Sequence, residues 1–180
     1  MISFLHIRSG LTFGTSRKVM SSFFVKNTGF RQIQNGKSIV LDFFVCRNPY
    51  ARAVSLWRDK CVLNGKTPNQ ECQKLILRFL PNGASLSALT FRDFCHLLPN
   101  LICKDEHFWT QSHGLISSDY RQLIHIENKN EFPNLSDVDW GHVENSSEHI
   151  EFPLPIVNAT PHKIITGLYD IDYVRFGYDL

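Results

Sequence analysis

The run Ser38-Ile-Val-Leu-Asp-Phe-Phe-Val-Cys46 is followed at once by Arg47-Asn-Pro-Tyr-Ala-Arg-Ala-Val-Ser-Leu-Trp-Arg58, and together they decide the fold class. The first run is almost continuously apolar, which is typical of a central strand of a parallel sheet that is buried on both faces. Pro49 suits the first turn of a helix. Apolar residues then recur at helical spacing, at Tyr50, Ala53, Val54, Trp57 and Cys61. A buried strand that leads directly into an amphipathic helix predicts an α/β fold.

The other predicted elements alternate in the same way. Ile2–Ile7 is expected to be a buried strand, followed by a polar loop from Arg8 to Ser16 and a helix toward Phe24. Later expected elements are a helical stretch within 67–83, a short helix after the capping box at 90–93 that ends at Pro99, a strand over 122–126 and a helix that opens with Thr160 as N-cap. The chain shows no repeat or linker. We therefore predict a single domain over residues 1–180, with a parallel β-sheet flanked by helices.

The composition narrows the class of function. The chain has 180 residues, 43% hydrophobic and 20% charged, with a net charge of +2, which is an ordinary globular balance. A dedicated nucleic-acid-binding protein would need a stronger basic excess, and acidic residues between positions 137 and 151 make the second half unsuited to one. We expect no nucleic-acid partner.

Cysteine usage and the N-terminus indicate where the protein works. Five cysteines occur without a CxxC pair, mostly among apolar neighbours, so we expect reduced, buried thiols. No Cys/His cluster has ligand spacing, and no metal is expected. The N-terminus lacks a basic segment ahead of its short apolar run, and no stretch reaches the roughly 20 apolar residues that span a bilayer. We expect a cytoplasmic protein, or the soluble remnant of a longer one, without a membrane span.

Arg47 and the helix that follows it form the first candidate binding site. Arg47 would stand at the carboxyl end of a buried strand, where open α/β sheets bind their ligands. Arg52, Ser55 and Arg58 then recur at three-residue steps, which would place two guanidinium groups and a hydroxyl on one side of the helix. Guanidinium groups bind phosphate through paired hydrogen bonds. The pattern predicts a terminal-phosphate site, with a solvated helix face as the alternative.

The N-terminal loop is the second candidate. A strand, a glycine-containing loop and a helix in succession present backbone N–H groups to a phosphate. The loop residues that would take part are Thr12, Gly14, Thr15 and Ser16, with Arg8, Arg17 and Lys18 as candidate cations. The loop lacks the Gly-Lys-[Ser/Thr] ending of a P-loop NTPase.

The segment Arg47–Lys60, with its pattern Arg-x-Pro-(aromatic)-x-Arg-x-x-Ser-x-(aromatic)-Arg-Asp-Lys, closely resembles the 3'-phosphate-binding motif of the carbohydrate-type (family 2) sulfotransferases. Three further segments resemble the same family in the same order, namely 105–112, 123–128 and 157–178. The resemblance implies a P-loop nucleotide-kinase-like sulfotransferase fold. It also implies that Arg47 and Ser55 hold the 3'-phosphate of the donor, 3'-phosphoadenosine-5'-phosphosulfate.

The implied reaction is in-line transfer of a sulfuryl group from that donor to a hydroxyl, expected to belong to a carbohydrate. Positioning and charge stabilisation dominate such transfers, and no metal is required. A base must take the proton of the acceptor hydroxyl. His107 is the first candidate because imidazole titrates near neutrality, followed by Glu106 and His6. Gln111 is expected either to orient substrate or to cap a turn, and Glu127 to bind backbone N–H groups near the donor or to be structural.

The donor loop leaves other hypotheses open. The family's loop reads Pro-Lys-(small)-Gly-x-[Ser/Thr], and neither matching frame, Leu11–Ser16 or Arg8–Gly10, supplies the lysine. A second hypothesis is therefore a catalytically impaired relative that binds adenosine 3',5'-bisphosphate or a glycan without turnover. A third is a P-loop kinase-like enzyme, against which the missing Gly-Lys-[Ser/Thr] argues.

Overall fold

The computed structural model describes the whole chain except residues 18, 34–39, 64, 66–69, 116–118 and 141–158. The chain divides into two compact units. The sheet unit comprises residues 1–48, 111–150 and 175–178, and the helical unit comprises residues 49–110, 151–174 and 179–180. The single domain expected from the sequence stays a prediction.

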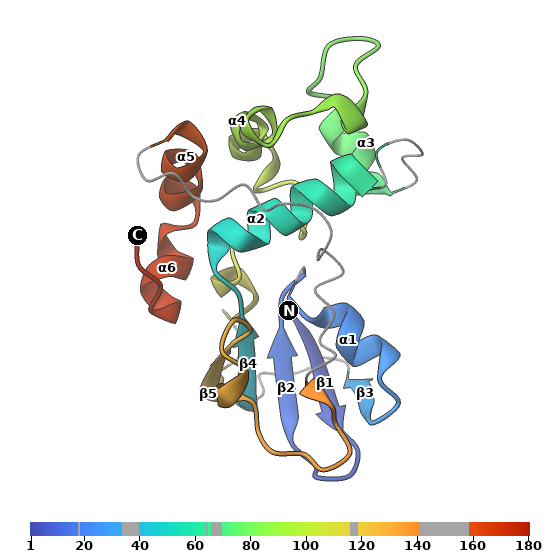
Figure 1. The fold of residues 1–180 in the computed structure, drawn as a ribbon, viewed down its shortest axis with the longest axis vertical. Helices are drawn as coiled ribbons and strands as arrows, with labels where there is room; N and C mark the ends of the chain where they lie inside the picture. The colour runs from blue at the N-terminus through green and yellow to red at the C-terminus, as the bar shows by residue number, and fades with distance from the viewer. Residues whose placement is uncertain (18, 34–39, 64, 66–69, 116–118, 141–158) are drawn as a thin grey trace. The chain divides into compact units, whose positions relative to one another are not determined.

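A five-stranded sheet forms the sheet unit (Figure 1). Its strands are β1 (Ile2–His6), β2 (Thr12–Thr15), β3 (Phe30–Ile33), β4 (Val40–Cys46) and β5 (Asp119–His125). They lie in the order β3-β1-β2-β4-β5. β2, β4 and β5 are parallel to one another, whereas β1 is antiparallel to both β2 and β3. The α/β class is confirmed, but the expected parallel sheet is wrong in part, because the sheet is mixed.

The N-terminal hairpin is the main departure from the prediction. Thr12–Thr15 belong to strand β2 rather than to a loop, and Ile2 of β1 pairs with Thr15. Gly10, in the turn between the two strands, has φ 74°, a conformation that glycine adopts without steric cost. Helix α1 (Ser21–Lys26) therefore begins five residues after Ser16, where the sequence predicted its start.

From Phe43 to Cys46, successive side chains of β4 enter two apolar clusters in alternation, as the pleat of a strand requires. Phe43 and Val45 join a cluster that is rich in aromatic rings, in which Phe24 of α1 stacks on Phe4 at a centroid distance of 4.9 Å. Phe44 and Cys46 join the other cluster, with Leu41, Leu115 and Phe176. Of the predicted strand over 38–46, residues 38 and 39 lie outside the described residues. The predicted burial is confirmed for Leu41 and for Phe44–Cys46, whereas Val40 is exposed.

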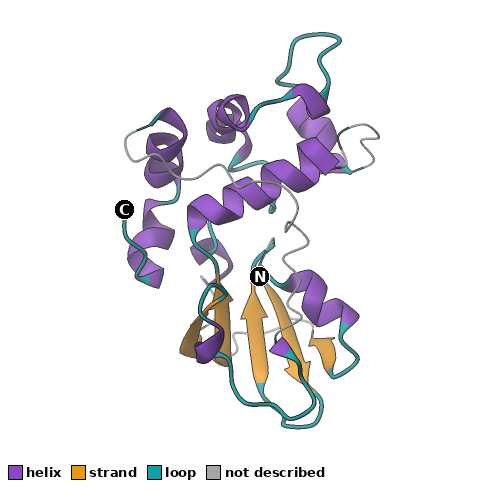
Figure 2. Cartoon of the chain, in the orientation of Figure 1, coloured by secondary structure: helices purple, strands orange, loops and turns teal. Residues whose placement is uncertain are grey.

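The helical unit begins at Pro49, three residues after the end of β4, and its described elements are helices, which Figure 2 draws in purple. α2 (Pro49–Trp57) continues as a π-helix over Arg58–Leu63, which confirms the predicted helix. The remaining helices are α3 (Glu71–Leu77), α4 (Phe91–Leu101), α5 (Thr160–Leu168) and α6 (Asp170–Phe176), and the last residues of α6 belong to the sheet unit. Short 3₁₀ turns occur at Leu86–Ala88, Ser112–Leu115 and Lys129–Glu131.

Three predicted helix boundaries are wrong. α3 is shorter than the stretch predicted within 67–83, and α4 runs two residues past Pro99. The N-cap of α5 is Ala159, so Thr160 is already inside the helix. No helix in the described part of the chain is long and apolar enough to cross a membrane.

Candidate functional site

The three parallel strands of the sheet unit end at a common edge. Thr15 of β2 pairs with Val45 of β4, and Cys46 of β4 pairs with His125 of β5. The segments that follow these strands begin at Ser16, Arg47 and Ile126, and they therefore extend from the same edge. This carboxyl edge is where open α/β sheets bind their ligands.

Gln111 binds both backbone groups of Arg47 at this edge. Its side-chain Oε1 accepts a hydrogen bond from the Arg47 N–H at 2.9 Å, and its Nε2 donates to the Arg47 carbonyl at 2.7 Å. Gln111 is fully buried, with 0% of its surface exposed. Gln111 therefore binds the backbone of the residue that follows β4, and its role toward substrate stays a prediction.

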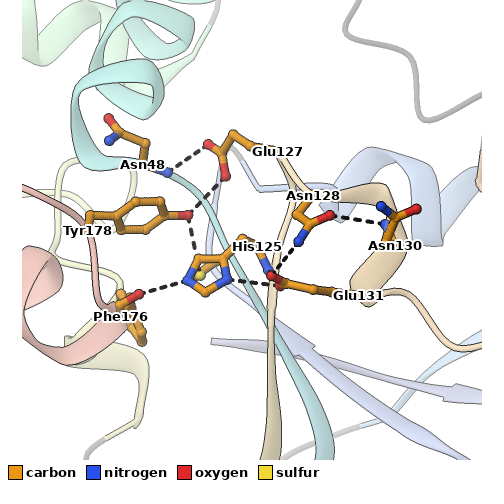
Figure 3. Close-up of polar contacts among 9 residues, drawn as sticks. Asn48, His125, Glu127, Asn128, Asn130, Glu131, Phe176 and Tyr178 are labelled. Atoms are coloured by element: carbon orange, nitrogen blue, oxygen red, sulfur yellow. Dashed lines mark hydrogen bonds and ion pairs between the residues drawn. The ribbon is translucent and has the colours of Figure 1, made fainter.

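Glu127 binds the next residue of the same segment (Figure 3). Its Oε1 accepts a hydrogen bond from the Asn48 N–H at 2.8 Å, and its Oε2 accepts one from the Tyr178 hydroxyl at 2.9 Å. The predicted contact of Glu127 with a backbone N–H is confirmed. The Tyr178 hydroxyl also lies 3.5 Å from the Cys46 sulfur. Burial raises the pKa of Tyr178 and raises that of Cys46 to about 12, so both groups are neutral near pH 7.

His125 ties the C-terminal segment to the end of β5 (Figure 3). Its Nδ1 lies 2.9 Å from Glu131 Oε2, and its Nε2 lies 2.7 Å from the Phe176 carbonyl oxygen. Both partners are acceptors, so only the doubly protonated ring donates to both. Burial lowers the pKa of His125, but the hydrogen bonds to Phe176 and Glu131 outweigh it and the net pKa is raised. No local pattern predicts this network, because β5 and residues 175–178 bring its members together only in the folded chain.

The predicted donor-loop residues separate into two groups. Arg8 is exposed in the turn before β2, and Thr12 begins the strand and binds Asp42 Oδ2 through its N–H and hydroxyl, at 2.9 and 2.8 Å. Gly14 is buried within β2. Only Thr15, Ser16 and Arg17 lie at the carboxyl end, while Lys18 is outside the described residues. The expected placement of Arg8 and Thr12 at this site is therefore corrected. Arg8 precedes β2 and Thr12 is its first residue, so both lie at the end of the strand opposite to the carboxyl edge.

The connection from β2 to α1 holds an unusual backbone conformation. Met20, just before α1, has φ 48° and ψ 2° in the left-handed region, and it is the one non-glycine residue with positive φ in the described chain. This region favours glycine, and a non-glycine residue there is often associated with a functional constraint. The Thr15 hydroxyl donates to the Val19 carbonyl within the same connection.

His6 lies at the other edge of the sheet. It ends β1, where Leu5 pairs with Thr12 at the start of β2, so it is remote from Arg47 along the strands. It is buried, with Nδ1 at 2.8 Å from Ser9 Oγ and Nε2 at 3.3 Å from Asp137 Oδ1. The expectation that His6 stands beside the donor loop is wrong. Thr12–Thr15, expected in that loop, form strand β2 and separate His6 from the carboxyl edge.

Arg52, in the helical unit, is buried rather than displayed on a helix face. Its exposed fraction is 3%, its Nη2 donates to the His107 carbonyl at 3.2 Å, and its guanidinium carbon lies 5.9 Å from the centre of the Tyr169 ring. Burial lowers the pKa of Arg52, while Tyr169 and buried Asp172 oppose this shift. These contacts argue for a structural role instead of the phosphate contact that its spacing predicted. Ser55, three residues on, is half-buried.

His107 is held by a carboxylate in the helical unit. Its Nδ1 lies 2.6 Å from Asp105 Oδ1, which also accepts a hydrogen bond from the His107 N–H at 2.8 Å. An acceptor on Nδ1 favours the tautomer whose Nε2 carries the lone pair that a general base needs. Glu106 is exposed. The contacts with Asp105 fix the orientation of the His107 ring.

Comparison with known proteins gave one match. A family model described as the Sulfotransferase family matches residues 15–179. No curated protein and no solved structure matches the chain. The matched range includes all the segments that extend from the carboxyl edge.

Proposed function

Because the chain belongs to the sulfotransferase family, we propose that it transfers a sulfuryl group from 3'-phosphoadenosine-5'-phosphosulfate to a hydroxyl of a carbohydrate. The observation that carries the proposal is the position of Arg47. The first arginine of the family's 3'-phosphate motif stands at the carboxyl end of β4, beside β2 and β5, with both its backbone groups bound by Gln111. An anionic donor at this edge is what the fold class favours.

The residues between β2 and α1 support a different alignment of the family's 5'-phosphosulfate loop with this sequence. The family's Pro-Lys-(small)-Gly-x-[Ser/Thr] aligns with Arg17-Lys-Val-Met-Ser-Ser22, whose last two residues begin helix α1. In this frame Lys18 stands at the lysine position. Met20 stands at the glycine position and has the left-handed φ that glycine favours. The impaired-relative hypothesis loses its motive, since the lysine is present in the sequence.

The 3'-phosphate is assigned to Arg47 and Ser55. The role of Ser55 rests on its spacing of eight residues after Arg47 in the family motif. Arg52 is left out of the binding set because its guanidinium is buried against Tyr169 and the His107 carbonyl. The Arg52 guanidinium thus contacts groups of the helical unit itself.

The proposed reaction balances without a further reactant. The acceptor oxygen forms a bond to sulfur as the bond from sulfur to the bridging phosphate oxygen breaks, giving a sulfate ester and adenosine 3',5'-bisphosphate. The acceptor proton goes to a base, for which we propose His107, oriented by Asp105. Arg17 and Lys18 are the cations that the new frame offers to the leaving phosphate.

Calorimetric titration tests the donor site. Adenosine 3',5'-bisphosphate should bind more tightly than adenosine 5'-monophosphate, and Arg47→Ala should weaken only the former, by about 10- to 100-fold for one charged hydrogen-bonding partner. Arg31→Ala, at an exposed position of edge strand β3, is the matched control and should bind as the wild type does. Equal affinity for the two nucleotides would contradict the proposal. Transfer of labelled sulfate to a glycan panel then separates an enzyme from a non-catalytic relative.

A further inference from the structure

We infer that Gln111 is a positioning residue for the donor's 3'-phosphate, acting through the backbone of Arg47; this inference rests on the proposed function. The carboxamide matches the two backbone groups of one residue, with the acceptor on the N–H at 2.9 Å and the donor on the C=O at 2.7 Å. Such a pair reproduces what a neighbouring strand supplies to the sheet. Gln111 thus extends the pairing of β4 by one residue, to the arginine that would bind the ligand.

The direction of the backbone groups shows why a substitute for a strand is needed there. In an extended chain the N–H and C=O of one residue point to one side, and those of the next residue point to the other. The Cys46 carbonyl accepts from the Ile126 N–H at 3.0 Å, on the β5 side. The groups of Arg47 therefore point to the β2 side, where the strand has ended at Thr15. Gln111 occupies the place that a longer β2 would fill.

Burial makes Gln111 the stronger of the two contacts at the strand end. Water cannot replace its hydrogen bonds, since 0% of the residue is exposed, and an unpaired buried amide is costly. Glu127 supports the Asn48 N–H on the other side, but it is exposed, so water can take over that role. Removing Gln111 would therefore free the Arg47 backbone to rotate, and rotation at the backbone displaces the guanidinium at the far end of the side chain. Paired hydrogen bonds to a phosphate tolerate little displacement.

A structural role alone would have a different signature. If Gln111 only stabilised the strand end, its loss would lower the melting temperature and reduce the binding of every nucleotide in the same proportion. If it acts through Arg47, its loss reduces the preference for a 3'-phosphate and has no further effect once Arg47 has been removed. The ratio of two dissociation constants and a double-mutant cycle separate these cases.

The experiment is calorimetric titration of the full chain with adenosine 3',5'-bisphosphate and adenosine 5'-monophosphate, for the wild type, Gln111→Met, Arg47→Ala and the double variant. We expect Gln111→Met to lower the preference for the 3'-phosphate about tenfold, the change that ~1.4 kcal/mol of binding free energy produces. In the Arg47→Ala background, Gln111→Met should change the preference less than twofold, because a residue that acts through Arg47 has no further effect once that side chain is gone.

A second glutamine supplies the matched control. Gln73 is also 0% exposed and donates to a backbone carbonyl, that of Lys60, at 3.0 Å within the helical unit. Gln73→Met should lower the melting temperature and leave the nucleotide preference unchanged. Gln111→Glu covers the case in which Gln111→Met does not fold. Its carboxyl donates to the Arg47 carbonyl only when protonated, so its nucleotide preference should recover as the pH falls, and a preference independent of pH would overturn the inference.

The outcomes separate the inference from the function on which it rests. A wild-type chain without preference for the 3'-phosphate overturns the proposed function. A wild-type preference that Gln111→Met leaves intact overturns the positioning role and leaves the function standing. An equal loss for both nucleotides, matched by Gln73→Met, assigns Gln111 a structural role and likewise overturns the inference.

Discussion

Replacing Arg52 with methionine should destabilise the protein without removing a donor contact. Arg52 is 3% exposed, and Asp172, whose charge acts on it, is 0% exposed. Methionine has a similar volume and keeps the apolar stem, so the packing is largely preserved while the charge, the hydrogen bond to the His107 carbonyl and the contact with the Tyr169 ring are lost. The His107 carbonyl would lose the charged donor that Arg52 provides.

The magnitude follows from the lost hydrogen bond. Removing a buried, charged donor and leaving its acceptor without this partner costs about 1–3 kcal/mol of unfolding free energy. For a chain of this length each kcal/mol shifts the melting temperature by roughly 2–4 °C, so Arg52→Met should melt roughly 2–12 °C lower.

Urea unfolding followed by circular dichroism measures the stability, and calorimetry with adenosine 3',5'-bisphosphate measures the donor site. Arg92→Met, at an exposed position of α4, is the matched control and should change neither quantity. Folded Arg52→Met protein, at a temperature well below its midpoint, should still distinguish the 3'-phosphate. Wild-type stability combined with lost nucleotide binding would refute the structural role and restore Arg52 to the binding set.

Two further predictions concern titratable groups. Because the pKa of His125 is raised from 6.5 in the folded state, its contribution to stability is complete below pH 6.5 and is lost as the pH rises through the higher folded pKa. Melting temperatures measured from pH 5.5 to 9 should therefore fall as the pH rises. The same curve should be flatter for His125→Gln. Burial raises the pKa of Glu131, which faces the ring, but its hydrogen bonds with His125 and Asn128 outweigh this and the net pKa is lowered, so this carboxylate does not titrate over the range. A curve unchanged in His125→Gln would therefore contradict the assignment. Among the thiols, exposed Cys103 should react first with iodoacetamide at pH 8, because burial raises the pKa of three others to about 12, those of Cys46, Cys61 and Cys95. Peptide mass spectrometry would identify the labelled residue, and rapid labelling of Cys46 would count against its burial beside Tyr178.

The elements with a strong local pattern could be predicted from the sequence. β4 and α2 were predicted because a continuous apolar run and a 3.6-residue period are properties of neighbouring residues. The β1–β2 hairpin was missed because β2 is only four residues long and contains two threonines and a glycine, a composition that also suits a loop. Ser9-Gly10 between two apolar runs was the available turn signal. β3 was missed because two of its four residues are exposed, which leaves no alternation to detect.

Long-range contacts limit what the sequence can predict of the site. Gln111 and Arg47 are 64 positions apart, and no local pattern shows that one side chain binds the other's backbone. Tyr178 and Glu127 are joined across 51 positions in the same way. The family resemblance marked these residues as members of motifs, but the contacts that explain them arise only when β4, β5 and the chain end are assembled.

Arg47 and Arg52 show why a motif does not by itself assign roles. They are five residues apart, and both suited a phosphate site because a guanidinium can bind one. Charged residues are rarely fully buried, which is why the sequence pattern favoured an accessible helix face for Arg52. The structure separates them: Arg47 has its backbone fixed at the carboxyl edge of the sheet, whereas Arg52 has its side chain enclosed in the helical unit. A fixed backbone with a half-buried side chain suits a ligand contact, and an enclosed guanidinium suits a structural one. Arg47→Ala should therefore weaken donor binding and leave the stability unchanged, whereas Arg52→Met should lower the stability and leave donor binding intact.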